Sequence, residues 1–188
     1  MKDQPAQTNF KTTLWNALIL NADFYENARN TPRNHRIART IVLLAAVSHL
    51  LGSAIILLIN LAQPLILFVA LILDGLSVIG GYYFWSFTIN IIGEKFKPNH
   101  VSYQELLIPI GFAYAPQVLN FLTVIPLLGR PIELILSVWS LLTAIVAVRQ
   151  GLDIKTRYAA LICLVGWPVI QLTIGFVQVF QQELVKRF

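Results

Sequence analysis

Charged residues are scarce in this sequence. Asp, Glu, Lys and Arg make up 12% of its 188 residues, whereas a soluble domain carries about a quarter. Cysteine is rarer still: Cys163 is the single cysteine, so no intramolecular disulfide can form and the redox compartment is not indicated. Three histidines and one cysteine also give no recognisable metal-ligand pattern. These shortages argue against a soluble protein and against a metal cofactor.

Catalytic motifs are missing as well. The sequence has no Gly-x-Ser-x-Gly elbow, no His-Glu-x-x-His pair, no Cys-x-x-Cys pair and no glycine-rich phosphate loop. Ser48, His49 and Asp74 supply the residue types of a hydrolase. However, adjacent Ser and His side chains point in different directions on a helix, which gives poor geometry for proton transfer. We therefore expect no enzyme activity and no cofactor.

The sequence does contain long apolar stretches. Hydrophobic residues form 56% of the chain, its mean hydropathy is +0.68, and several blocks reach the roughly 20 residues that cross a bilayer. The pattern predicts an all-α integral membrane protein with five transmembrane helices, at residues 41–61, 65–92, 103–125, 131–148 and 158–179. Ser102 and Glu105 form a capping-box pattern before the third span. Pro131 suits a helix start and Gly151 a helix end.

The basic residues predict the orientation of these spans. Most of them precede the first span or lie in the second-to-third and fourth-to-fifth loops: Lys2, Lys11, Arg29, Arg33, Arg36, Arg39, Lys95, Lys97, Arg149, Lys155 and Arg157. The other side has Arg130, Lys186 and Arg187. The positive-inside rule therefore places the N-terminus in the cytoplasm and the C-terminus outside. We expect the members of the first group from Arg29 onward to contact anionic lipid headgroups, so the net charge of +5 needs no nucleic-acid partner.

Residues 1–40 form a cytoplasmic N-terminal segment in this interpretation, ahead of a five-helix domain at residues 41–188. No secretory signal is recognisable, so we expect the first span to direct insertion. Apolar residues at helical spacing indicate an amphipathic helix lying in the headgroup plane, built from Phe10, Leu14, Leu18, Trp15 and Ile19. A solvated tail is the alternative. Three residues are expected to interrupt this helix: Asn21, Pro32 and Asn34.

The third span is unusually polar for a lipid-facing helix. It contains Pro109 and Pro116, seven residues apart, and the amide side chains of Gln117 and Asn120. Each proline is expected to kink the helix and to leave one backbone carbonyl without its helical donor, that of Glu105 for Pro109 and that of Phe112 for Pro116. In hydrocarbon every such group needs a partner within the protein. Interhelical bonds from the amides would contribute roughly 0.6 to 2 kcal/mol each. We therefore expect this face to pack against other helices or to line water.

The first two spans carry small residues four positions apart. Ser48 and Gly52 have this spacing in the first span, and Ser77 and Gly81 have it in the second. Small residues at this spacing let two helix backbones approach closely. The pattern predicts that the two spans pack tightly against each other.

Two ionisable side chains lie deep in the predicted bilayer, His49 in the first span and Asp74 in the second. Counted along the helices, their depths differ by about 5 Å, so antiparallel neighbours could bring them together. An intramembrane carboxylate is a functional hypothesis by default, here proton or ion handling. The alternative is a structural contact in which Ser77 or a tyrosine hydroxyl caps a neutral Asp74.

The sequence also resembles the bacterial branch of the Yip1 family. The resemblance is carried by a Gly-Phe-Ala…Pro pattern, an Ile-Pro-x-x-Gly turn and a Trp-bearing span that ends in Val-Arg-Gln-Gly, at Gly111–Ala113 with Pro116, Ile125–Gly129, Trp139 and Val148–Gly151. An Ala-rich final span and "ADFYENAR" before the first span are similar too. The resemblance implies five spans, a cytoplasmic N-terminus and a prokaryotic inner or internal membrane.

Eukaryotic Yip1 relatives bind Rab-type GTPases through a long N-terminal region with an Asp-Leu-x-Gly-Pro element, which this chain lacks. The resemblance therefore brings neither that role nor any catalytic residue. Two hypotheses follow. The first is a non-enzymatic membrane module that interacts with other membrane proteins or with itself, or organises lipid. The second is a small transporter or channel component whose path is lined by His49, Asp74 and the face formed by Pro116, Gln117 and Asn120.

Overall fold

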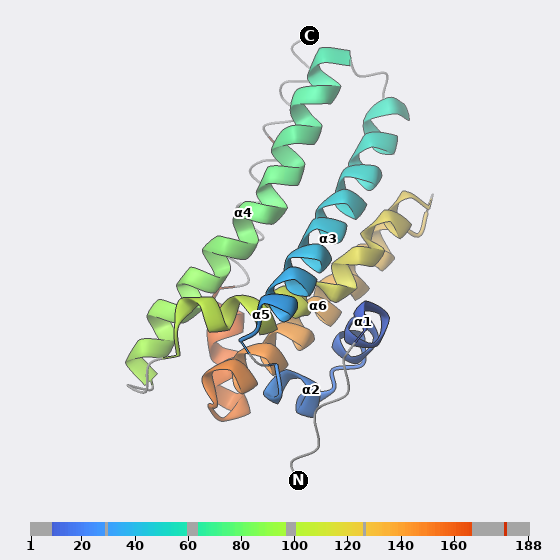
Figure 1. The fold of residues 1–188 in the computed structure, drawn as a ribbon. Coiled ribbons are helices and arrows are strands. Elements are labelled where there is room, and N and C mark those ends of the chain that lie inside the picture. Colours follow the sequence, from blue (N-terminus) through green and yellow to red (C-terminus); the bar gives the residue numbers. More distant parts are fainter. Residues whose placement is uncertain are drawn as a thin grey trace.

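The computed structural model describes residues 9–28, 30–59, 64–96, 101–125, 127–166 and 179. Within these residues the fold is entirely helical (Figure 1). The elements are α1 (Phe10–Leu18), α2 (Ala22–Glu26), α3 (Pro32–Ile59), α4 (Pro64–Phe96), α5 (Tyr103–Ala113), the 3₁₀ helix η1 (Ala115–Val124) and α6 (Gly129–Leu152). A shorter apolar helix, Thr156–Gly166, follows α6.

Four helical segments are long and apolar enough to cross a membrane: α3, residues Leu67–Glu94 of α4, the α5–η1 unit and α6. These are four of the five predicted spans, and they make the chain a multi-pass membrane protein. The fifth predicted span, 158–179, coincides with the Thr156–Gly166 helix at its start. Its remainder, apart from Val179, lies outside the described residues.

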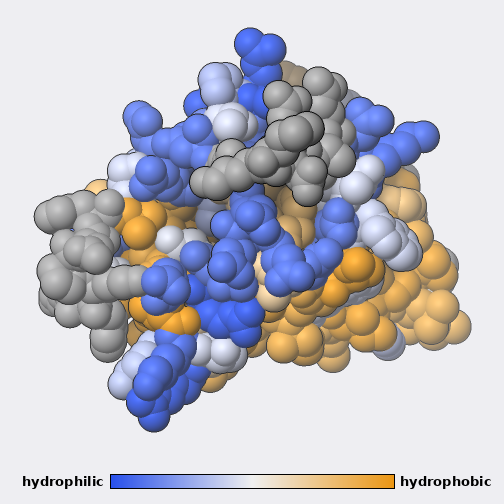
Figure 2. All heavy atoms as spheres, turned by 60° about the horizontal axis from the view of Figure 1, so that its bottom comes forward, coloured by the Kyte–Doolittle hydropathy of each residue, from blue (hydrophilic) through white to orange (hydrophobic). Residues whose placement is uncertain are grey.

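Figure 1 shows α3 and α4 as a long antiparallel pair, with α5, η1 and α6 beside it and α1 and α2 against the lower end. Hydrophilic residues gather at that lower end when it is turned toward the viewer (Figure 2). It contains the first turns of α3 with Arg33, Arg36 and Arg39, and the last turn of α6 with Arg149. We call this the basic end of the bundle.

Local signals set the start of several helices. Ser102 and Glu105 form the predicted capping box: the Ser102 hydroxyl accepts from the Glu105 amide at 3.4 Å, and the Ser102 amide donates to the Glu105 carboxylate at 2.9 Å. The Asn21 side chain caps the start of α2. The helix α3 begins at Pro32, nine residues before the predicted first span. Asn34 lies inside α3, so its prediction as a helix breaker is wrong.

The third span changes helix type in its middle. We expected a kinked α-helix, but α5 ends at Ala113 and the chain continues as a 3₁₀ helix from Ala115. Pro116 falls in the first turn of η1, where a missing N–H is tolerated. Pro109, in contrast, lies inside α5. Ten residues is long for a 3₁₀ helix. Helices of this type are usually short, because their hydrogen-bond geometry is poorer than that of an α-helix.

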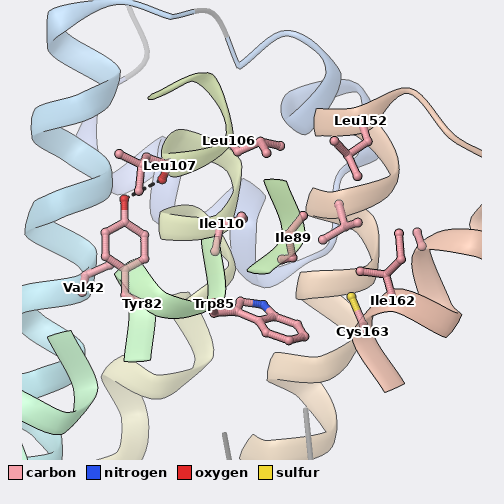
Figure 3. Packing of buried hydrophobic residues seen from close by; sticks show 12 residues of the cluster. Val42, Tyr82, Trp85, Ile89, Leu106, Leu107, Ile110, Leu152, Ile162 and Cys163 are labelled. Carbon is pink, nitrogen blue, oxygen red and sulfur yellow. Dashed lines mark hydrogen bonds between the residues drawn. The ribbon is translucent and has the colours of Figure 1, made fainter. Parts of the chain in front are cut away.

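The core at the basic end joins α4, α5, α6 and the helix after α6. Tyr82, Trp85 and Ile89 of α4 form one cluster with Leu106 and Ile110 of α5 (Figure 3). The Tyr82 hydroxyl donates to the Leu107 carbonyl at 2.7 Å, which satisfies the buried phenol. Leu152, Ile162 and Cys163 close the cluster from the other side (Figure 3).

The N-terminal helices pack on the bundle. Ala17 of α1 and Tyr25 of α2 belong to a second core cluster with Ile108 and Phe112 of α5. Burial raises the pKa of the Tyr25 hydroxyl well above its usual range. Phe10, Leu14 and Leu18 pack against this cluster, so their predicted placement against the membrane is wrong. Trp15 and Ile19, which we grouped with them, face outward and are 64% and 50% exposed.

Candidate functional site: paired polar groups inside the bundle

His49 of α3 and Asp74 of α4 meet inside the helical bundle. The His49 Nδ1 atom lies 3.3 Å from Asp74 Oδ2, and Asp74 is 2% exposed. The contact follows from the matching depths of the two residues on antiparallel neighbours. One turn further along α3, Ser53 donates its hydroxyl to the same carboxylate oxygen at 2.6 Å. We call His49, Ser53 and Asp74 the polar cluster.

Ser53 was missed in the sequence, although it stands four residues after His49 and therefore on the same helix face. Ser77 was one of the alternatives for capping the Asp74 side chain. Its hydroxyl donates instead to the backbone carbonyl of Asp74 at 2.7 Å, and the carboxylate is bonded by side chains of α3. A serine on the same helix reaches the preceding-turn carbonyl more readily.

The polar cluster contains a base and an acid, the His49 imidazole and the Asp74 carboxyl group. Its one hydroxyl, that of Ser53, donates to the carboxylate and not to the imidazole, so the structure gives no Ser–His pair for nucleophilic attack. The Ser48 hydroxyl accepts from the Phe121 amide of η1 at 2.8 Å, so Ser48 bonds to η1 whereas His49 contacts Asp74 of α4. Among the described residues, no group of three or more His, Cys, Asp or Glu side chains could hold a metal ion.

A second set of polar contacts joins the third span to α6. The Thr143 hydroxyl donates to the Ala113 carbonyl at 2.9 Å, and the Gln117 amide donates to the Ser140 hydroxyl at 2.8 Å. In a 3₁₀ helix the Ala113 carbonyl would accept from residue 116, which is a proline. Thr143 can therefore supply the donor that Pro116 lacks, and its one hydroxyl hydrogen also has the Ser140 and Trp139 carbonyls of its own helix within reach, at 2.9 Å and 3.2 Å. We call Gln117, Ser140, Thr143 and the Ala113 carbonyl the polar seam.

The prolines and amides of the third span lie against protein. Pro109, Pro116 and Asn120 are buried and Gln117 is half-buried. We expected Pro116 to free the Phe112 carbonyl, as in a continuous α-helix. The carbonyl bonded by Thr143 is that of Ala113, because the helix changes type at this point.

The small residues of the first two spans do not face each other as predicted. A methyl group added at Gly52 would come 3.3 Å from the Thr123 hydroxyl of η1, and one at Gly81 would come 3.9 Å from the Tyr114 hydroxyl. The contact between α3 and α4 uses Gly75 instead, where an added methyl group would meet the Leu50 side chain at 3.3 Å. The pattern of small residues identified close packing but not the partner helix.

The basic residues expected at headgroups share the basic end. Arg33, Arg36, Arg39, Lys155 and Arg157 are exposed, and Arg149 is half-buried. Arg157 lies over the Tyr158 ring, 4.9 Å from its centroid. Arg29 and Lys97, and the side chain of Lys95, lie outside the described residues.

Comparison with known proteins gives one match. The family model described as the Yip1 domain matches residues 15–178, which include every described helix except the start of α1. No curated protein and no solved structure matches the chain.

Proposed function

The chain belongs to the Yip1 domain family, and on this premise we propose that it is a non-enzymatic membrane module that assembles with other membrane proteins or with copies of itself. Its polar cluster and polar seam satisfy their hydrogen bonds within the chain. The surface left for partners is therefore the apolar exterior of the helices and the basic end.

The outward face of α4 carries this proposal. Large apolar side chains recur there, in steps of three or four residues apart from one step of eight between Leu76 and Phe84. They are 45% to 63% exposed in Phe68, Ile72, Leu76, Phe84 and Phe87. Gly80 lies in the middle of this stripe, and a methyl group added to it would meet no atom within 4 Å. In membranes, helices associate through close packing at such small residues. The face suits a transmembrane helix of a partner or of a second copy.

The basic end supports a cytoplasmic N-terminus and contact with anionic lipid. Arginines at the start of α3 and the pair Lys155 and Arg157 are exposed at the same end of the bundle. Each basic residue near an anionic surface contributes about 1 kcal/mol to attraction. The positive-inside rule then makes this end cytoplasmic.

Cross-linking in native membranes, followed by mass spectrometry, tests the module. We expect one stoichiometric membrane partner, or a second copy, whose recovery falls at least tenfold in Gly80→Phe. The matched control is Val138→Phe on the outward face of α6, where Val138 is 55% exposed. Equal recovery of the partner from both variants would exclude the α4 face as the binding surface. Absence of any partner from the native protein would contradict the proposed function as an assembly module.

A small transporter or channel component is the second candidate, favoured by the polar cluster. Midplane polar groups and broken helices are typical of transporter folds, and this chain has both. Against it, the carboxylate of Asp74 is 3% exposed and is bonded by two side chains of α3. Proton or cation flux into proteoliposomes that Asp74→Asn abolishes would establish this candidate over the first.

A further inference from the structure

The helix α1 differs on its outward side from one end to the other. Lys11 and Thr12, in its first turn, are exposed polar residues. Trp15 and Ile19, one and two turns later on the same side, are 64% and 50% exposed and apolar. An isolated exposed tryptophan is common at a membrane interface. The change from polar to apolar side chains along these nine residues indicates that the two ends of α1 have different surroundings.

Two hydrogen bonds fix the end of α1 against α6. The Trp139 indole N–H donates to the Leu18 carbonyl at 2.9 Å, and the Gln150 amide donates to the Ala22 carbonyl at 3.2 Å. Gln150 lies in the last turn of α6, at the basic end. Trp139 lies ten residues before Arg149 and nine after Arg130, about 15 Å and 14 Å along the helix. Leu18 is therefore attached near the middle of an apolar span.

The chain turns between these two attachments. Trp139 and Gln150 are separated by eleven residues, about 16 Å of helix, while Leu18 and Ala22 are four residues apart. The Leu20 amide donates to the Ala17 carbonyl at 3.3 Å and the Asn21 amide to the Asn16 carbonyl at 3.1 Å. Leu20, between them, has a positive φ of 56°, which turns the chain out of α1.

The last carbonyls of α1 are all bonded within the protein. Those of Trp15 and Asn16 accept backbone amides at 3.0 Å and 3.1 Å, that of Ala17 accepts an amide at 3.3 Å and the Tyr25 hydroxyl at 3.4 Å, and that of Leu18 accepts the Trp139 indole. A helix end in water can leave such groups to solvent. A helix end in hydrocarbon must satisfy every one of them.

We propose that α1 slopes into the bilayer from the basic end, with Lys11 and Thr12 among headgroups, Trp15 at the boundary between headgroups and acyl chains, and Ile19 among the acyl chains of that leaflet. The acyl chains are the occupant because Trp139, which bonds the end of α1, lies near the middle of an apolar span whose Ile135 and Val138 are 62% and 55% exposed. The segment after Leu18 then returns through α2 to the basic end, where α3 begins. This inference does not depend on the function proposed above.

Spin-label depth measurement in liposomes tests the slope. In a Cys163→Ala background, single nitroxide labels are placed by Thr12→Cys, Trp15→Cys and Ile19→Cys. Access to oxygen relative to a water-soluble nickel chelate is then compared with Leu134→Cys, on the apolar exterior of α6, and Lys155→Cys, at the basic end. We expect the ratio to rise from 12 to 15 to 19, at least threefold overall, and to approach the Leu134 value at 19. Equal ratios at all three positions, or a value at 19 equal to that at Lys155, would overturn the proposal.

Two further measurements extend the test, and the second is independent of the cysteine background. Trp139→Phe keeps an aromatic ring but removes the donor to Leu18, so we expect the label at 19 to become shallower while the Leu134 reference stays unchanged. An unchanged depth at 19 would contradict the attachment. In the native sequence in nanodiscs, we expect hydrogen exchange of the amides at residues 16–21 to be as slow as in α6. Exchange there as fast as at residues 153–156 would contradict insertion.

Discussion

The polar cluster and the polar seam both place hydrogen-bonding groups inside a membrane protein, but they differ in charge. The cluster joins α3 to α4 through a carboxylate that imidazole and hydroxyl groups surround. The seam joins η1 to α6 through neutral amide, hydroxyl and carbonyl groups. Loss of a partner leaves a desolvated charge in the first and an unmatched dipole in the second. The cluster can therefore respond to protonation, whereas the seam repairs a backbone broken by proline.

His49→Leu should have the largest effect, because it leaves the Asp74 carboxylate with Ser53 as its remaining side-chain donor. Removing one partner of a buried hydrogen bond costs about 1 to 3 kcal/mol, and more where the group left behind is charged, whereas replacing both partners by apolar residues can be nearly neutral. Unfolding in mixed micelles should show that loss for His49→Leu and recovery of most of it in the His49→Leu, Asp74→Leu double variant. A loss as small as that of a seam variant would remove the contrast between the two regions.

Thr143→Val should have an intermediate effect, because it removes the donor to the Ala113 carbonyl. An unsatisfied buried acceptor costs about 1 to 3 kcal/mol. Pro116→Ala restores an N–H that can reach the same carbonyl, so Thr143→Val should cost less in that background. A double-mutant cycle on the free energy of unfolding measures the difference. Equal costs in both backgrounds would contradict the view that Thr143 replaces a donor lost at Pro116.

Gln117→Leu should have the smallest effect. The side chain is half-buried, its bond to Ser140 is neutral, and such interhelical bonds average about 0.6 kcal/mol in a membrane protein. Ser140→Ala should give a similar change, and the double variant should add little to either, which the same unfolding assay can measure. A loss comparable with that of His49→Leu would show that the seam, too, has a larger role.

The spans themselves were predictable because apolar length and local caps are properties of a short stretch of chain. Apolar length predicted the four spans that the structure describes, and the Ser102–Glu105 capping box is present as expected. The His49 and Asp74 contact followed from helix rise and antiparallel order alone. Each of these inferences needs at most two neighbouring helices.

The features that were not predicted depend on how each helix is rotated in the bundle. The helix α4 is apolar on all sides, so its sequence marks no inward face, and Gly75 was overlooked beside Gly81. The partner of Gly52 proved to be η1. The inward face of α1 was equally ambiguous, because Phe10 and Trp15 are both apolar. Which of these side chains packs against the protein depends on the positions of α5 and α6.

The most direct test of the account is whether the third span turns its amide toward α6. In a Cys163→Ala background, Gln117→Cys with Ser140→Cys should be joined by a short bifunctional thiol reagent in native membranes, and mass spectrometry should identify the linked peptides. Phe121→Cys with Ser140→Cys is the matched control, since Phe121 is 44% exposed. Linkage of the first pair well above the second is the predicted result. Equal linkage, or none at Gln117, would mean that this segment faces lipid and that the bundle is assembled differently.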